Sequence, residues 1–399
     1  MLDKPLTLPS GAVIKNRIVK AAMSDGLADS KNHATEQHIH LYRRWSNGGA
    51  GLLIIGEVQV DHRHLERPGN IALDRAGGIK ALRAMTAAGT VAGNHFWAQL
   101  GQAGLLSFPE INATPLAPSA VSVRGNQPRA MTESDILELI ARYADAAAIS
   151  REAGFTGIEI HAAHGFLLSQ FLSPRFNQRA DDWGGSLENR ARLLLEIART
   201  VRAKIGEDYP MAVKLNASDF QEGGFSFAES QQLARWLDRE RIDLLAISGR
   251  VHQSDDDAIP DENPSKDNLA GEAYFLEYAS IIKKTVNIPV MVTGGFRTRA
   301  GMMAAFEHGI DLIGLARPIV VDAELPRKLL AGTTDICPRI EDSFSTDLPF
   351  GAGTAWFQMQ IIRMANKMEV DLSISPEKAL EMMIDFDHKA ARRYCRELA

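Results

Sequence analysis

Residues 157–174 are Gly-Ile-Glu-Ile-His-Ala-Ala-His-Gly-Phe-Leu-Leu-Ser-Gln-Phe-Leu-Ser-Pro, and this stretch decides the fold. The run Gly157–His161 has the composition of a strand buried on both faces, and an apolar helical run follows after a very short loop. A strand that passes directly into a helix is the building unit of a parallel sheet. Two histidines, His161 and His164, stand where this strand ends.

The same alternation of strand and helix extends over most of the chain. The strand candidates, rich in Val, Ile and Leu, are Arg17–Met23, Gly51–Val60, His95–Leu100, Gly157–His161, Met211–Asn216, Leu244–Ser248, Val290–Thr293 and Leu312–Ala316. Eight such units predict an α/β protein, a (β/α)8 TIM barrel covered by helices. A doubly wound open sheet ranks below the barrel, because no Gly-x-Gly-x-x-Gly motif follows an early strand.

The helix candidates carry recognisable ends. Thr132 with Asp135 resembles a capping box, and Ser186 is expected to be an N-cap. Gly154 and Gly206 stand where helices are expected to stop. The clearest helices are Ser134–Ala153, Ser186–Ile205, Phe227–Arg241, Ala273–Val286, Arg299–Glu307 and Glu324–Ala331.

Several segments lie outside the repeat. Residues 6–14 predict a hairpin with a Pro-Ser-Gly turn that could close the bottom of the barrel. Gly101–Arg129 and Val251–Asn268 follow strand ends, so they would lie on the active-site face, as lids or as ordinary surface loops. We divide the chain into a barrel, residues 1–332, and a C-terminal helical extension, residues 333–399, packed on the barrel or on a neighbouring subunit.

Composition excludes several classes of protein. Among 399 residues, 44 Lys and Arg stand against 50 Asp and Glu, and a net charge of −6 argues against a nucleic-acid partner. Only two cysteines are present, which excludes an iron–sulfur cluster and makes a disulfide framework improbable. No signal peptide or membrane span is visible, so we expect a cytoplasmic protein, with a homo-oligomer as one option.

His161 and His164 converge only if the chain turns directly after the strand. Two imidazoles could then bind one substrate oxygen and stabilise the negative charge that it gains on reduction. The same pair could ligate zinc, with Glu159 or Asp219 recruited as a third ligand, or it could be structural. The residues alone leave these three interpretations open.

A phosphate site is indicated at the ends of the last two strands. Gly294 and Gly295 follow the seventh strand, and Ala316 and Arg317 follow the eighth. Glycines let backbone N–H groups approach an anion, and Arg adds a planar charged fork. The loops after strands seven and eight bind phosphate in many TIM barrels, which favours this interpretation over a plain turn.

The long run from His161 to Pro174 resembles the signature of the Old Yellow Enzyme family, the flavin ene-reductases. The segments Lys15–Val19, Asn177–Arg179, Asp182–Ser186 and Ser218–Phe220 are similar to the same family. The resemblance implies FMN as cofactor, NADH or NADPH as reductant, and a small-molecule electron acceptor. It also implies the single-domain type, without the iron–sulfur cluster of longer relatives.

The resemblance assigns roles to several residues. It places Gln99 and Lys214 at the polar edge of the flavin, Ser24 near the flavin O4, and Glu57 where a backbone group meets the flavin. It places Gly294, Gly295, Ala316 and Arg317 at the FMN phosphate. Lys214 stands where the family usually has Arg, so this position keeps the positive charge but lacks the bidentate hydrogen-bonding geometry of a guanidinium group. Asn177, Arg179 and Arg190 are expected to brace the loop.

Phe166 departs from the family, which usually has Tyr there as proton donor to the substrate. Phe has no proton to give, so we expect slow reduction of enones and better reduction of quinones or nitro compounds. Solvent, Tyr274 or Tyr278 could supply the proton. Two alternatives stay open: a flavin-free lyase with Lys214 as a Schiff base, and a metal-dependent hydrolase using the two histidines. A non-catalytic flavin-binding protein ranks last.

Overall fold

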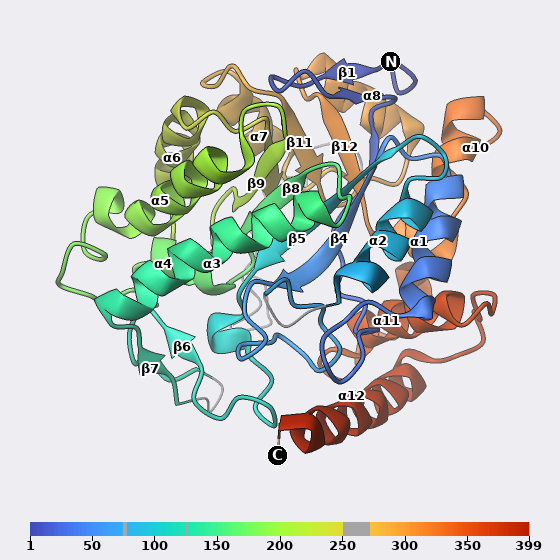
Figure 1. Cartoon of the computed structure of the whole chain (residues 1–399). Coiled ribbons are helices and arrows are strands. Elements are labelled where there is room, and N and C mark those ends of the chain that lie inside the picture. The colour runs from blue at the N-terminus through green and yellow to red at the C-terminus, as the bar shows by residue number, and fades with distance from the viewer. Residues whose placement is uncertain (75–77, 124–126, 250–271, 399) are drawn as a thin grey trace.

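The computed structural model describes residues 1–74, 78–123, 127–249 and 272–398 (Figure 1). Eight parallel strands close into one barrel, in which each strand pairs with the next along the chain and the last pairs with the first. The strands are β3 (Ile18–Lys20), β4 (Leu52–Gln59), β5 (His95–Gly101), β8 (Ile158–Ala162), β9 (Met211–Asn216), β10 (Leu244–Ser248), β11 (Val290–Thr293) and β12 (Leu312–Leu315). The predicted (β/α)8 barrel is confirmed.

Helices surround the barrel, as Figure 1 shows. They are α1 (Glu36–Asn47), α2 (Ile79–Gly89), α3 (Glu133–Glu152), α4 (Leu167–Leu172), α5 (Leu187–Ile205), α6 (Phe227–Arg239), α7 (Leu276–Lys283), α8 (Arg299–Glu307), α9 (Arg317–Val321) and α10 (Leu325–Ala331). Thr132 and Asp135 form the predicted capping box of α3, and Ser186 caps α5. Helices α1, α2, α4 and α9 add to the clearest predicted set.

The bottom of the barrel is closed by the predicted hairpin, in which β1 (Leu6–Thr7) pairs antiparallel with β2 (Val13–Ile14). Side chains on a strand alternate between the two faces, so every second residue points into the barrel. The apolar cluster inside the barrel joins the hairpin to inward strand residues: Leu6, Leu8, Ile14, Val19, Leu52, Ile54, Trp97, Ala212, Leu244, Ala246, Met291 and Leu312. The hairpin therefore plugs this end of the barrel.

The segment after β5 is not wholly irregular. It contains a 3-10 turn, η1 (Gly104–Leu106), and a short strand, β6 (Leu116–Ala117), that pairs in parallel with β7 (Arg129–Ala130). The other predicted lid, Val251–Asn268, lies outside the described residues.

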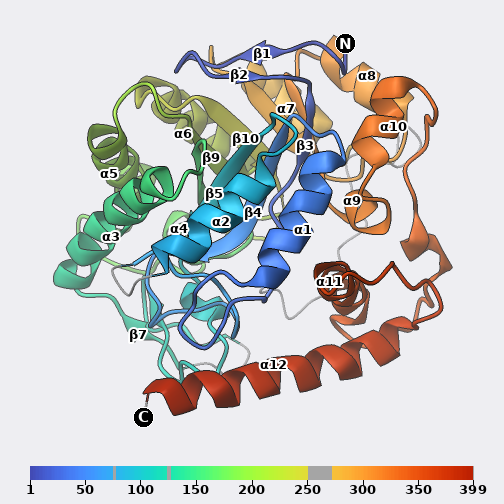
Figure 2. The same ribbon diagram turned by 45° about the vertical axis from the view of Figure 1, so that its right-hand side comes forward.

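The C-terminal extension contains η3 (Ile340–Ser343), α11 (Ala352–Ala365) and α12 (Pro376–Leu398). Figure 2 shows α12 stretched along the side of the barrel opposite the hairpin. Asp387 accepts a hydrogen bond from Arg67 Nη2 at 2.6 Å, and the Tyr394 hydroxyl donates to the backbone oxygen of His62 at 2.6 Å. Helix α12 thus lies against the loop that follows β4. Among the described residues, no helix is both long and apolar enough to cross a membrane.

Lys20 is a fully buried cation on the outer side of β3. Its Nζ donates to the backbone oxygen of Ile54 at 2.9 Å and lies 4.4 Å from the centre of the Trp45 ring. Burial lowers the pKa of Lys20 to about 7, although the negative charge of Asp25 opposes this shift. An ammonium group held in this environment costs folding free energy whenever it is charged.

Replacing Lys20 with Met tests this cost. The folded pKa of about 7 lies below the ordinary value of 10.5, so the penalty is fully present below pH 7 and is relieved as the pH rises. The advantage of Lys20→Met in free energy of unfolding should therefore shrink by about 2–3 kcal/mol between pH 7 and pH 9. Denaturant unfolding at several pH values measures it. The exposed Lys80→Met is the control, and an advantage independent of pH would contradict the prediction.

Candidate active site

A polar layer lies above the apolar plug inside the barrel. Gln99 comes two residues after the inward Trp97 on β5, and Lys214 comes two residues after the inward Ala212 on β9, so both point inward. Both side chains are buried, with 2% and 4% of their surface exposed. The closed barrel therefore holds a neutral donor and a cation in its interior, at the end where active sites of this fold lie.

Glu159 on β8 is the partner of this layer. Gln99 Nε2 donates to Glu159 Oε1 at 2.7 Å, while Glu159 Oε2 has no hydrogen-bond partner among the described residues. Burial raises the pKa of Glu159, and the positive charge of Lys214 opposes the rise. A buried carboxylate oxygen without a partner is costly, which indicates a site that receives a further polar group.

The two histidines converge through a tight turn. Strand β8 ends at Ala162, and His164 takes a left-handed conformation with φ of +61°. This turn brings the two imidazole centres to 5.1 Å, as the hypothesis of a histidine pair requires. The His164 backbone N–H donates to Asn216 Oδ1 at 3.0 Å, and His164 Nε2 lies 2.9 Å from Ser248 Oγ.

Glu57 is the immediate neighbour of His161. The pairing of β4 with β5 shifts register between Ile55 and Val58, and Glu57 lies in this irregularity. Its Oε1 is 3.1 Å from His161 Nε2, and the two residues are 6% and 1% exposed. The structure therefore places Glu57 in a buried acid–imidazole pair.

Phe166 lies at the start of α4 and packs against His161. The two ring centres are 4.8 Å apart, and Phe166 is 7% exposed. Position 166 thus faces the histidine pair and offers it an apolar ring without a proton. Of the tyrosines considered as replacements, Tyr278 packs edge-on against Phe227 of α6, and Tyr274 lies against Gly295.

Ser24 has a partner that the sequence did not indicate. Its hydroxyl donates to Glu66 Oε2 at 2.8 Å, and Asn70 Nδ2 donates to the same oxygen at 3.2 Å. Burial raises the pKa of Glu66, and the charge of the adjacent Arg67 opposes the rise. Glu66 was missed because it lies in a loop, where no strand period signals the direction of a side chain.

The predicted phosphate loops lie at the ends of neighbouring strands β11 and β12. Gly294 and Gly295 have positive φ values of 141° and 77°, and the rings of Phe275 and Tyr274 lie against the two glycines. The hydroxyl of Thr293 is buried without a partner among the described residues. A close-packed turn beside an unpaired donor is compatible with an approaching anion.

The predicted phosphate residues after β12 lie at the start of a helix. Ala316 precedes α9 and Arg317 begins it. The Arg317 guanidinium is exposed and lies 5.5 Å from the centre of the Phe357 ring of α11. The extension thus holds the side chain that the sequence assigned to phosphate.

The signature residues downstream of α4 form the expected network. Asn177 Nδ2 donates to the backbone oxygens of Phe171 and Trp183, each at 2.8 Å. Arg179 Nη1 donates to the backbone oxygen of Met131 at 2.6 Å, and Arg190 donates to the backbone of Leu172. These side chains satisfy backbone carbonyls and thereby tie the end of α4 to the loop that follows it.

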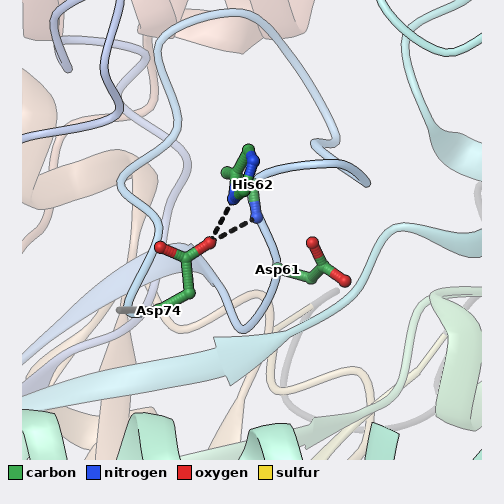
Figure 3. Close-up of side chains that lie close together, drawn as sticks. All are labelled: Asp61, His62 and Asp74. Carbon is green, nitrogen blue, oxygen red and sulfur yellow. Dashed lines mark hydrogen bonds and ion pairs between the residues drawn. The ribbon is translucent and has the colours of Figure 1, made fainter. Parts of the chain in front are cut away.

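The metal interpretation of the histidine pair gains no support from the geometry. Within the described part of the chain, the one group of three possible ligands is Asp61, His62 and Asp74, in the segment after β4 (Figure 3). Asp61 is already bound by the guanidinium of Arg63, with Arg142 at 3.2 Å, and His62 contacts Asp74 directly. These contacts explain the group without a metal ion.

The fold and site define a barrel enzyme whose C-terminal face combines a buried cation, an amide and paired imidazoles. Residues 1–335 match the NADH:flavin oxidoreductase / NADH oxidase family, and the chain belongs to this family. The match agrees with the family resemblance that the sequence indicated. The match argues against the lyase and hydrolase alternatives.

Individual relatives agree with this assignment. An NADH-dependent flavin oxidoreductase of Neonectria sp. is 32% identical over 93% of this chain and 52% of its own length. The NADH oxidase of Thermoanaerobacter brockii is 35% identical over 80% of this chain and 49% of its own. This chain thus spans about half the length of both relatives.

Solved structures give the same result. A 2-naphthoyl-CoA reductase superposes with a TM-score of 0.75 at 28% identity, over 83% of this chain and 52% of its own. An Old Yellow Enzyme homologue from Zymomonas mobilis superposes with a TM-score of 0.72 at 25% identity, over 88% of this chain and 99% of its own.

The residues present fit FMN. Among the described residues, one oxygen of Glu159 on β8 and the hydroxyl of Thr293 on β11 are buried polar atoms without a hydrogen-bond partner. Gln99 and Lys214 would hold the polar edge of the ring system, and Lys214 would balance the negative charge that reduction adds.

Lys214→Met tests this assignment. Losing one charged hydrogen bond of about 1.5–3 kcal/mol should weaken FMN binding by roughly 10- to 100-fold. Lys214→Arg keeps the charge and should bind FMN within a few-fold of the unmodified protein. Titration of the apoprotein with FMN, followed by flavin fluorescence, measures both dissociation constants. Equal affinity of Lys214→Met and the unmodified protein would remove Lys214 from the cofactor site.

Proposed function

We propose that this protein is an FMN-dependent NAD(P)H oxidoreductase that reduces small electron-poor acceptors such as quinones, nitro compounds and, more slowly, enones. The observation that supports it best is the convergence of Lys214, Gln99 and the pair His161–His164 on one face of the barrel. When bound, FMN supplies the chemistry of hydride transfer from the nicotinamide to the acceptor. The protein binds, orients and polarises the reactants.

Lys214 and the two histidines have different roles, which follow from their positions in the barrel. Lys214 lies in β-sheet register beside His161, so the charge that favours a reduced cofactor is next to the group that meets the acceptor. His164 is fixed by two contacts, since its backbone N–H donates to Asn216 Oδ1 and its ring Nε2 lies 2.9 Å from Ser248 Oγ. Imidazoles at this strand end can stabilise negative charge on an acceptor oxygen by donating hydrogen bonds to it.

The visible spectrum of the purified protein tests the proposal. A flavin absorption band that bleaches on anaerobic addition of NADH or NADPH, and returns on addition of a quinone, is the expected result. A protein that carries no flavin and takes up no added FMN would overturn the proposal. Borohydride trapping of a carbonyl compound on Lys214 would then become the experiment of choice.

Phe166→Tyr tests the reason for slow enone reduction. A phenol beside His161 can donate a proton to the α-carbon, and positioned proton transfer contributes about 10²- to 10⁴-fold. Enone turnover should therefore rise by about 10-fold or more, while quinone turnover should stay within about 2-fold. Steady-state assays with both acceptors measure the ratio. A ratio unchanged from that of the unmodified protein would show that the ring at 166 does not limit enone reduction.

A further inference from the structure

The environment of His161 suggests how this site supplies a proton. Position 166 carries an apolar ring 4.8 Å from the imidazole, while the other side of the imidazole meets a carboxylate, Glu57, at 3.1 Å. A buried carboxylate against an imidazole is the arrangement that proteins use to set the state of a catalytic histidine. Family membership assigns no such role to Glu57.

The hydrogen bonds fix which nitrogen of His161 carries the proton. Its Nδ1 accepts a long hydrogen bond of 3.3 Å from the backbone N–H of Ala163. Nε2 faces the carboxylate of Glu57, so the proton lies on Nε2. Nδ1 is therefore the nitrogen without a proton, and a proton added there must replace the long contact with the Ala163 N–H and would make an imidazolium paired with a carboxylate.

Other titratable and charged groups lie around the pair of Glu57 and His161. Glu57 faces the buried carboxyl groups of Glu66 and Glu159 and the phenol of Tyr143. On the side of His161 lie Lys214 and the ring of His164. Two carboxyl groups, those of Glu57 and Glu159, and the ammonium group of Lys214 thus lie around the imidazole.

We propose that Glu57 and His161 form a proton-donating pair that protonates the oxygen of the acceptor, in place of carbon protonation by a tyrosine at position 166. His161 is the catalytic acid, and Glu57 is a positioning residue that fixes its tautomer and balances its charge. This inference rests on the proposed function, because it needs an acceptor reduced by hydride from the bound cofactor.

The step balances for both classes of acceptor. An enone gains a hydride at its β-carbon, its C=C π electrons move toward the oxygen, and the Nδ1–H bond of His161 breaks as an O–H bond forms. The product leaves as an enol and becomes the ketone in solution. A quinone gains a hydride and the same proton to give a hydroquinone. Neutral His161 remains held by Glu57 in the oxidised protein and takes its next proton from solvent once the cofactor has been reduced again.

Stereochemistry distinguishes oxygen from carbon protonation without any variant. An enone with a methyl group on its α-carbon, such as 2-methylcyclohexenone, should give nearly racemic product, because the enol gains its carbon-bound proton in solution. The product is analysed at early times by chiral chromatography, so that later exchange does not matter. A large enantiomeric excess would overturn the proposal, because it requires a donor positioned at the carbon.

Glu57→Gln tests the role of the carboxylate. The amide can still accept from His161 Nε2 but carries no charge, so reoxidation by a quinone should slow by at least about 10-fold relative to reduction by NADH. Glu240→Gln, the same substitution at the residue that follows α6 and outside the site, should leave this rate unchanged.

Nitrogen NMR of histidine-labelled protein gives a readout independent of turnover. In the oxidised protein, the signals of His161, assigned with a His161→Ala variant, should show a protonated Nε2 and a bare Nδ1. Glu57→Gln should shift these signals, because the negative charge beside Nε2 is lost. Unchanged signals with unchanged reoxidation would overturn the inference, while a flavin that still bleaches with NADH would leave the proposed function intact. A protein that binds no flavin would fail the proposed function itself.

Discussion

On every strand of the closed barrel, successive side chains alternate between the interior and the outside, and the rest of the structure depends on this alternation. One inward position packs against the hairpin plug, and the next inward position along the same strand meets the active-site face. On β5 the inward residue changes from the apolar Trp97 to the polar Gln99, and on β9 it changes from Ala212 to Lys214. Apolar packing thus fixes the depth and direction of the polar groups.

Much of this could be predicted from the sequence, because barrel strands buried on both faces have a distinctive composition. All eight strand candidates overlap observed strands, and the hairpin and the turn after His161 were also predicted. The pairing of Glu57 with His161 could not be predicted, because it depends on a register irregularity in β4. The bond from Ser24 to Glu66 depends on the path of a loop, which has no period to detect.

In the candidate site, the residue at one position of a motif affects which role is expected of the residues around it. With Phe at position 166, the surroundings of His161 gain importance, since a proton must come from another group. The carboxyl groups of Glu57, Glu66 and Glu159 enclose an interior that also contains Lys214. An interior that contains both acidic and basic side chains costs folding free energy. It is expected where the residues serve the chemistry of a site and not the stability of the fold.

Helix α12 has a consequence for how the site is assembled. Its contact with the loop after β4 joins Arg67 to Asp387, 320 positions further along the chain. A contact between such distant positions closes a loop of most of the chain, and the packing of α12 must offset the entropic cost of that closure. The order of the loop after β4 is therefore linked to the far end of the chain, and hydrogen exchange in that loop would report the docking of α12.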